Sequence, residues 1–266
     1  MEIRLAISPC PNDTFIFDPI INGRIDLEGL AFSVEFHDVE TLNGMALQGK
    51  PDMVKVSYHA WLYLQDGYTL LDSGSALGQG NGPLLIAKKA FALEQLSNKV
   101  VAVPGAYTTA HLLLRLLAPP PKEKRFMVFS AIEEALLNGE VDAGVIIHEN
   151  RFTYMQKGLV CIADLGALWE SRTGSMIPLG GILARKELGN ETVAKLNRIL
   201  HRSVSYSLDH PAIAMPFVQS HAQEMDLQVM RQHIQLYVND FTLTLGAKGH
   251  QALQQLRQLA VERGII

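Results

Sequence analysis

Strand and helix signals alternate from the first residues of this 266-residue chain, and this alternation limits the possible folds more than any other feature. Short apolar runs typical of buried strands are separated by stretches with helical periodicity. The first elements are expected at 3–8 (strand), 14–22 (helix), 31–37 (strand), 39–48 (helix) and 53–57 (strand). Strands that alternate with helices in this way predict an α/β fold with helices on both faces of a sheet.

The length of the chain and its glycines predict two lobes. A chain of this size exceeds the usual single domain, and glycine-containing stretches at 74–83 and 177–184 suit crossings between lobes because glycine tolerates unusual backbone angles. We expect a larger lobe from 1–87 and 180–266 and a smaller lobe from 88–179. Apolar residues recur at steps of three or four after residue 191, which predicts helices on the outside of the larger lobe.

Composition favours a small-molecule partner. The net charge is −4 and the pI about 6.1, without an extended basic stretch, so no nucleic-acid partner is expected. No apolar run is long enough to span a membrane. Only Cys10 and Cys161 are present, which indicates thiols in a reducing compartment, and the first residues lack signal-peptide features. A cytoplasmic protein without a membrane partner is expected, and its oligomeric state is left open.

His148 is the first candidate for chemistry. The apolar run 145–147 predicts a buried strand that ends at this histidine, and open α/β sheets bind their ligands at the carboxyl ends of strands. An imidazole can accept a proton near neutral pH. A single histidine after a strand is more often a hydrogen-bonded loop residue, so this segment alone leaves both interpretations open.

Polar residues at other strand ends are candidates for binding. Lys55 could pair with a carboxylate, and Ser57 could orient it, although a lysine beside a strand is usually a solvated charge. Asn43 could supply an uncharged hydrogen-bonding group or serve only local capping. Thr108 and Thr109 follow a strand and a glycine turn, where they would form either an anion cradle or an ordinary helix N-cap.

The turn at 8–14 offers Asn12, Asp13 or Thr14 as the N-cap of the first helix, whose start would suit an anionic group. Cys10 could be a nucleophile there, but packing is its more usual role. HExxH, GxSxG and phosphate-loop motifs do not occur in the sequence. The sequence therefore predicts neither a metal site nor nucleotide binding.

Several of these segments together resemble the 1,4-dihydroxy-6-naphthoate synthase family of the futalosine route to menaquinone. The segments are Ser8–Phe15, Asp38–Asn43, Lys55–Tyr58, Pro104–Ala110 and Gly144–Tyr154. The first and the last are the most specific. The resemblance implies a fold like that of type II periplasmic binding proteins, with two α/β lobes, two crossings and a central cleft.

The resemblance also implies a carbon-carbon lyase that acts on cyclic dehypoxanthine futalosine without a cofactor. His148 matches the family's proton acceptor. Lys55, Val56, Ser57, Thr109 and Ala110 match the family's substrate-binding segments. With Thr108 and Asn43 from the strand-end and helix-start patterns above, they are the candidate binding residues.

Other interpretations stay open. A cytoplasmic protein that binds an aromatic carboxylate would share the fold, as would the chorismate dehydratase of the same pathway; the His148 segment favours the synthase. His59 and His111 could protonate the departing fragment, although both are more typical of structural residues. Tyr107 stands where family members can carry a different side chain, and its effect on the cleft is not predicted.

Overall fold

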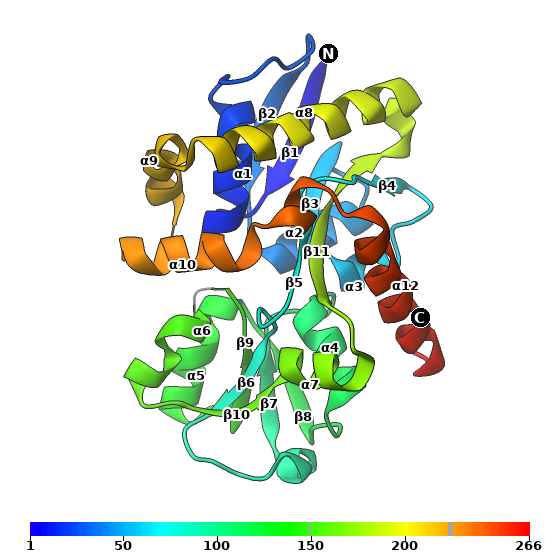
Figure 1. Cartoon of the computed structure of the whole chain (residues 1–266). Coiled ribbons are helices and arrows are strands. Elements are labelled where there is room, and N and C mark those ends of the chain that lie inside the picture. The colour runs from blue at the N-terminus through cyan, green and yellow to red at the C-terminus, as the bar shows by residue number, and fades with distance from the viewer. Residues whose placement is uncertain (149, 223–225) are drawn as a thin grey trace.

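The computed structural model describes residues 1–148, 150–222 and 226–266, and its strands form two separate sheets, one in each lobe (Figure 1). The larger sheet has the order β2-β1-β3-β11-β4, and β5 pairs with β11. Its strands are β1 (Glu2–Ile7), β2 (Ala31–Phe36), β3 (Met53–Ser57), β4 (Tyr68–Leu70), β5 (Ala76–Gly78) and β11 (Ile177–Arg185). β1 runs parallel to β2 and β3, whereas β11 is antiparallel to its partners.

The smaller sheet has the order β10-β6-β9-β7-β8. Its strands are β6 (Leu84–Ala87), β7 (Val100–Val103), β8 (Glu123–Phe126), β9 (Ala143–Ile146) and β10 (Val160–Asp164). β7 runs parallel to β8 and β9, and β6 is antiparallel to β9 and β10. The parallel pairs bring the carboxyl ends of their strands to one edge of each sheet.

Helices cover both sheets (Figure 1). In the larger lobe these are α1 (Pro11–Ile21), α2 (Val39–Leu47), α3 (Tyr58–Trp61), α8 (Asn190–Asp209), α9 (Pro211–His221), α10 (Leu227–Tyr237) and α11 (Asp240–Leu243). In the smaller lobe they are α4 (Thr109–Leu117), α5 (Ile132–Asn138), α6 (Asn150–Thr153) and α7 (Leu165–Thr173). The last helix, α12 (Gly246–Glu262), packs against both α4 and β11. Short 3-10 turns lie at Leu93–Asn98, Phe129–Ala131, Tyr154–Lys157 and Lys186–Leu188.

The two-lobed α/β architecture agrees with the expected fold class, but the strand pairing differs from the expected boundaries. β6 lies within the segment assigned to the larger lobe, yet it pairs with β9 and β10 of the smaller sheet. The first crossing therefore lies before Leu84, in the glycine-rich stretch that connects the two sheets. β11 begins at Ile177 and pairs with β5, so the second crossing precedes the expected residue 180.

Polar residues near the helix starts mark the N-cap of α2 but not that of α1. Asp38 caps α2 by accepting hydrogen bonds from the backbone of Glu40 and Thr41, at 3.0 and 3.2 Å. The N-cap of α1 is Cys10 and not Asn12, Asp13 or Thr14, because Pro11 already occupies the first helical position.

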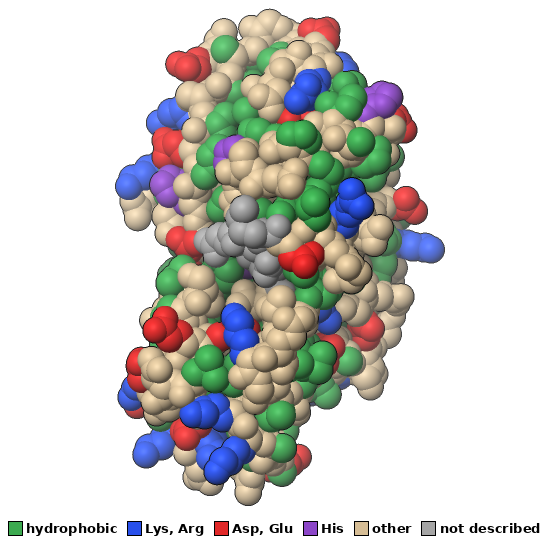
Figure 2. Space-filling view, turned by 90° about the vertical axis from the view of Figure 1, so that its left-hand side faces the viewer, with side chains coloured by type: hydrophobic (Ala, Val, Ile, Leu, Met, Phe, Trp, Pro, Cys, Tyr) green, Lys and Arg blue, Asp and Glu red, His purple; other side chains and the backbone are tan. Residues whose placement is uncertain are grey.

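A hydrophobic cluster joins the lobes. It includes Tyr58 of α3, Leu113 of α4, Trp169 of α7 and Leu256 of α12, all buried. A second cluster lies between the larger sheet, α1 and α8, whose apolar stripe packs as the sequence predicts. On the face shown in Figure 2, acidic and basic side chains are interspersed over both lobes. None of the described helices combines the length and apolarity that crossing a membrane requires.

Candidate active site

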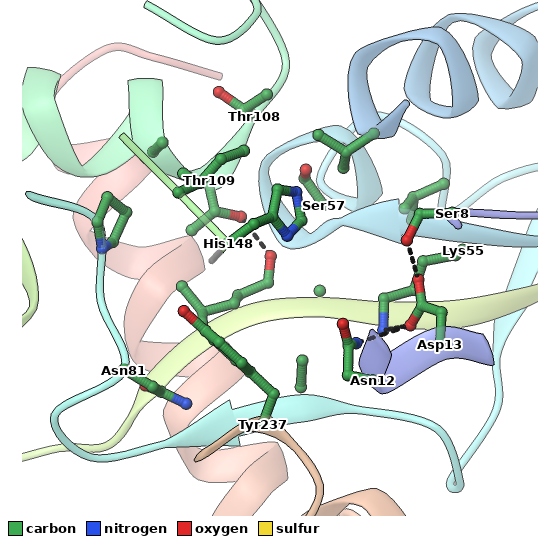
Figure 3. Close-up of a pocket in the computed structure, with 18 of the residues that line it drawn as sticks. Ser8, Asn12, Asp13, Lys55, Ser57, Asn81, Thr108, Thr109, His148 and Tyr237 are labelled. Carbon is green, nitrogen blue, oxygen red and sulfur yellow. Dashed lines mark hydrogen bonds and ion pairs between the residues drawn. The ribbon is translucent and has the colours of Figure 1, made fainter. Parts of the chain in front are cut away.

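A pocket of about 680 Å³, part of it open to solvent, lies where the two lobes meet (Figure 3). Both lobes contribute because the carboxyl ends of β1 and β3 in one sheet, and of β7 and β9 in the other, lead into it. Its polar lining consists of Ser8, Asn12, Asp13, Lys55, Ser57, Asn81, Thr108, Thr109, His148, His233 and Tyr237. Such a crevice at strand ends is the usual ligand site of an open α/β sheet.

His148 reaches the pocket from the loop after β9. Its Nδ1 lies 3.5 Å from Sγ of Cys10. The ring packs edge-on against Phe129, with centroids 4.9 Å apart, and is stacked with His233 at 6.1 Å. The backbone of His148 has φ +58°, a left-handed conformation that is uncommon outside glycine, which fits a functional position. The imidazole is therefore held between groups from both lobes.

A buried ion pair lies at the larger-lobe side of the pocket. Lys55 Nζ is 3.0 Å from Asp13 Oδ1 and also donates to the Gly74 carbonyl at 3.3 Å. Asp13 accepts further hydrogen bonds from Ser8 Oγ at 2.7 Å and from Asn12 Nδ2 at 2.8 Å. An ammonium group has three protons to donate, so Lys55 can still offer one to a ligand.

The hydrogen bonds of Asn12 define the tautomer of His233. The Asn12 amide nitrogen donates to Asp13, so its Oδ1 is an acceptor, and His233 Nε2, 2.9 Å away, must carry the proton. His233 is fully buried, and this burial, followed by the nearby His148, lowers its pKa well below the ordinary value. His233 is therefore neutral at physiological pH.

Ser57 is oriented from behind by Asn43. The Asn43 Oδ1 accepts from the Ser57 backbone N–H at 2.9 Å, and its Nδ2 donates to Ser57 Oγ at 3.3 Å. Because the serine oxygen accepts from Asn43, its own hydroxyl proton remains to be donated to a ligand. Asn43 does not line the pocket and so supports Ser57 instead of contacting a ligand directly.

The two threonines have different roles. Thr108 is the N-cap of α4, with Oγ accepting from the His111 N–H at 3.2 Å. The Thr109 hydroxyl donates to the Leu179 carbonyl at 2.6 Å, so its proton is not available to a ligand. The backbone N–H groups in the first turn of α4 have no intrahelical acceptor, and they favour an anionic or carbonyl oxygen.

The structure brings most of the sequence-predicted residues together. His148, Lys55, Val56, Ser57, Thr108, Thr109 and Ala110 all line the pocket. His59 and His111 lie outside it and bond to the carbonyls of Thr108 and Ala106, at 3.1 and 2.8 Å. Burial lowers the pKa of each to about 4, which fits structural residues.

Other lining residues were missed. The sequence indicates Asn12 and Asp13 only as helix caps and gives no signal for Asn81 as a pocket residue, yet these three, with His233 and Tyr237, line the pocket. The helices after residue 191 were expected outside the larger lobe, yet α10 supplies His233 and Tyr237 to the pocket. Their spacing of four on one buried helix face was a weak signal that such residues could share a site. Within the described ranges, no three His, Cys, Asp or Glu side chains are grouped to hold a metal ion.

The fold and pocket define a two-lobed α/β protein with a pocket between the lobes and a histidine in that pocket. The same fold occurs in a solved ligand-binding component of an ABC-type import system from Staphylococcus aureus, with a TM-score of 0.74, 13% identity, and coverage of 100% of this chain and 93% of that one. The chain belongs to the menaquinone biosynthesis family, whose family model matches residues 3–262.

More similar proteins support this membership. A relative from Thermus thermophilus, named 1,4-dihydroxy-6-naphthoate synthase, is 45% identical over 99% of this chain and 95% of its own length. A solved structure from Archaeoglobus fulgidus is 33% identical, with a TM-score of 0.94 and coverage of 100% of this chain and 98% of that one.

Proposed function

We propose that this chain is a carbon-carbon lyase that converts cyclic dehypoxanthine futalosine to 1,4-dihydroxy-6-naphthoate, with His148 as the general base. The observation that carries the proposal is the position of His148 in the interlobe pocket, which the donors Lys55 and Ser57 also line. The name of the Thermus thermophilus relative supports the choice of reaction.

The proposed reaction would use these residues as follows. His148 removes a proton from the substrate, and the electron pair left behind forms a new double bond of the ring as the bond to the sugar-derived part breaks. The sugar-derived part leaves with the electron pair of the broken bond and takes up a proton from solvent. Formation of the aromatic naphthalene ring supplies much of the driving force. A positioned general base typically contributes about 10²- to 10⁴-fold to the rate. The protons of Ser57 and Lys55 stabilise negative charge that develops on oxygen during bond breaking.

The smaller lobe contributes through backbone groups. Because the Thr109 hydroxyl is committed to Leu179, we assign oxygen binding to the N–H groups of Thr109 and Ala110 at the start of α4. This assignment uses backbone groups and not the Thr109 side chain. It explains why a threonine that reaches the pocket is held by Leu179 of β11: the contact fixes the helix start against the larger lobe.

The proposed setting is a cytoplasmic reaction on a small molecule, without a cofactor and without a nucleic-acid or membrane partner. The absence of an extended basic stretch and the modest negative charge support the absence of a nucleic-acid partner. His148 supplies the base, and aromatisation supplies the driving force, so the proposed reaction involves no electron transfer to or from a cofactor.

The test is to incubate wild-type protein, His148→Ala and His201→Ala with cyclic dehypoxanthine futalosine and to measure naphthoate release by chromatography. His201 is exposed on α8 and serves as the matched control. We expect product from wild type and His201→Ala, and at least about 100-fold less from His148→Ala.

Other outcomes would replace the proposal. Full activity in His148→Ala would remove His148 from the role of base. Wild-type protein that binds an aromatic carboxylate but releases no product would indicate a binding protein. Dehydration of chorismate by wild type, without naphthoate release, would indicate the related dehydratase.

A further inference from the structure

We propose that Cys10 is a positioning residue for His148, which holds the imidazole in the tautomer that a general base needs. The proposal rests on the function proposed for His148 and deepens the account of that site. The observation behind it is the 3.5 Å contact between Cys10 Sγ and His148 Nδ1. Cys10 is not assigned to contact the substrate.

Cys10 is well suited to hold another group because its own backbone is fixed. Pro9 and Pro11 restrict the chain on either side. The Cys10 N–H donates to Ser8 Oγ at 3.3 Å, and its carbonyl accepts from the N–H groups of Asp13 and Thr14, each at 3.0 Å. The thiol is buried, with 6% of the residue exposed. Its sulfur therefore occupies a defined position at the start of α1.

The two tautomers of His148 have opposite chemical properties. If Nδ1 carries the proton and donates it to Cys10 Sγ, Nε2 keeps a lone pair and can accept a proton from the substrate. If the thiol donates to Nδ1, Nε2 carries the proton and cannot act as the base. The proposed function requires the first arrangement, so Cys10 Sγ is the acceptor. A fixed acceptor at Nδ1 is how enzymes commonly select the tautomer of a basic histidine.

The contact also crosses between the lobes. Cys10 precedes α1 of the larger lobe, whereas His148 follows β9 of the smaller lobe. The stacked ring of His233, on α10 of the larger lobe, packs on the same imidazole. The base is thus carried by one lobe and oriented by the other.

Other ionisable groups surround this pair, and the test must separate them from Cys10. His233 faces His148 directly, and Lys55 and Asp13 line the same pocket. Lys55 and Asp13 are paired with each other at 3.0 Å, so their charges largely offset. Arg151, the charged residue of α6, is 3.9 Å from Asp164. Substitution of Cys10 leaves all four of these groups unchanged.

The direct test reads the tautomer by nitrogen NMR of the histidine side chains, without substrate, at pH 8. His148→Asn identifies the signal of His148. We expect the proton on Nδ1 in wild type, in Cys10→Ser and in the control Cys161→Ser, whose thiol is exposed on β10. In Cys10→Ala, and in Cys10→Val, which fills the space without an acceptor, we expect this preference to be lost. Wild type with the proton on Nε2, or an unchanged tautomer in both apolar variants, would overturn the proposal.

The second readout is steady-state kinetics on the same variants. Cys10→Ala and Cys10→Val are expected to lower kcat by about 10- to 100-fold with KM changed by less than about threefold, because orientation and not binding is lost. Cys10→Ser is expected to restore kcat to within about tenfold of wild type. A rise in KM with kcat unchanged would contradict a positioning role.

The two readouts separate failure of this inference from failure of the proposed function. If wild type releases no naphthoate but the tautomer depends on Cys10, the pairing is correct and the reaction is wrong. If wild type is active, and neither the His148 tautomer nor kcat changes in the Cys10 variants, the proposed reaction is supported and the positioning role is wrong.

Discussion

The buried residues of the pocket explain why its charge is arranged in pairs. Lys55 and Asp13 are 7% and 2% exposed, and either alone would bring a large desolvation cost. The sequence indicated that Lys55 could pair with a carboxylate, and the chain itself provides that carboxylate. The pair keeps a cation near the ligand while the overall charge of the pocket wall stays close to neutral. Lys55 can therefore bind a developing oxyanion without a buried unpaired charge in the empty protein.

His59 and His111 predict how stability depends on pH. Their pKa values fall to about 4, mainly by burial, whereas an unfolded histidine has a pKa of about 6.5. The unfolded chain therefore binds more protons between these values, so stability is full above about pH 6.5 and is lost as pH falls toward 4. Urea denaturation at pH 7, 6 and 5 should show this decline, at up to about 1 kcal/mol per pH unit for His59.

The variant His59→Asn isolates this effect, and exposed His201→Asn is its control. The decline with falling pH should be shallower in His59→Asn and unchanged in His201→Asn. Equal slopes in both variants and wild type would mean that His59 does not stay neutral in the folded protein. Only the slope is diagnostic, because the substitution can also change stability at every pH.

At the scale of elements, the sequence predicts what is local. The strands at β1, β2, β3 and β9 and the cap of α2 follow from apolar alternation and from a single aspartate. The segments that end at Ser57 and His148 were therefore recognised as strand ends. Parallel pairing then brings such ends together, so several candidate residues from each lobe do meet at the pocket.

Contacts between elements far apart in the chain could not be predicted from local sequence patterns. His233 reaches the pocket because α10 packs against α1, and no pattern within α10 specifies that partner. The sequence predicts Asp13 as a cap, but α1 begins at Pro11, so Asp13 lies inside the helix and is free to pair with Lys55. β6 was assigned to the wrong lobe because a short apolar run carries no information about which sheet it joins.

Gly105, in the segment between β7 and α4, gives a prediction about how elements of the two lobes meet. It has φ +155°, and a Cβ added there would lie 2.4 Å from Cδ of Glu40 on α2. The Glu40 carboxylate accepts from the Tyr107 N–H at 3.1 Å across the lobes, and burial raises its pKa. Gly105→Ala should therefore displace Glu40 and destabilise the protein by more than about 1 kcal/mol.

The matched control for this prediction is Gly44→Ala, in α2 itself. An added Cβ at Gly44 meets no atom within 4 Å, and alanine favours helix, so this variant should be neutral or more stable by up to about 1 kcal/mol. Urea denaturation of both variants checks the pair. A Gly105→Ala protein as stable as wild type would show that the interlobe contact tolerates a side chain there.

At the scale of the whole molecule, the two lobes share a hydrophobic cluster that couples their unfolding. Each has its own sheet, but the cluster around Tyr58, Trp169 and Leu256 is shared, and α12 packs against both lobes. Apolar burial shared in this way couples the stabilities of the two lobes. A single cooperative transition is therefore expected.

The two tryptophans of the chain allow a direct test, since Trp61 lies on α3 of the larger lobe and Trp169 on α7 of the smaller lobe. Trp61→Phe leaves the fluorescence of Trp169, on the smaller-lobe side of the shared cluster, and Trp169→Phe leaves that of Trp61, on the larger-lobe side. Within each variant, the urea midpoint from fluorescence should equal that from far-ultraviolet circular dichroism, which reports both lobes. Trp169 is fully buried, so its variant should be less stable by about 1–3 kcal/mol, and the loss should appear in both signals because the core is shared. If fluorescence from Trp61 in Trp169→Phe kept the wild-type midpoint while the dichroism shifted, the larger lobe would be stable by itself, and the shared cluster would not couple the lobes.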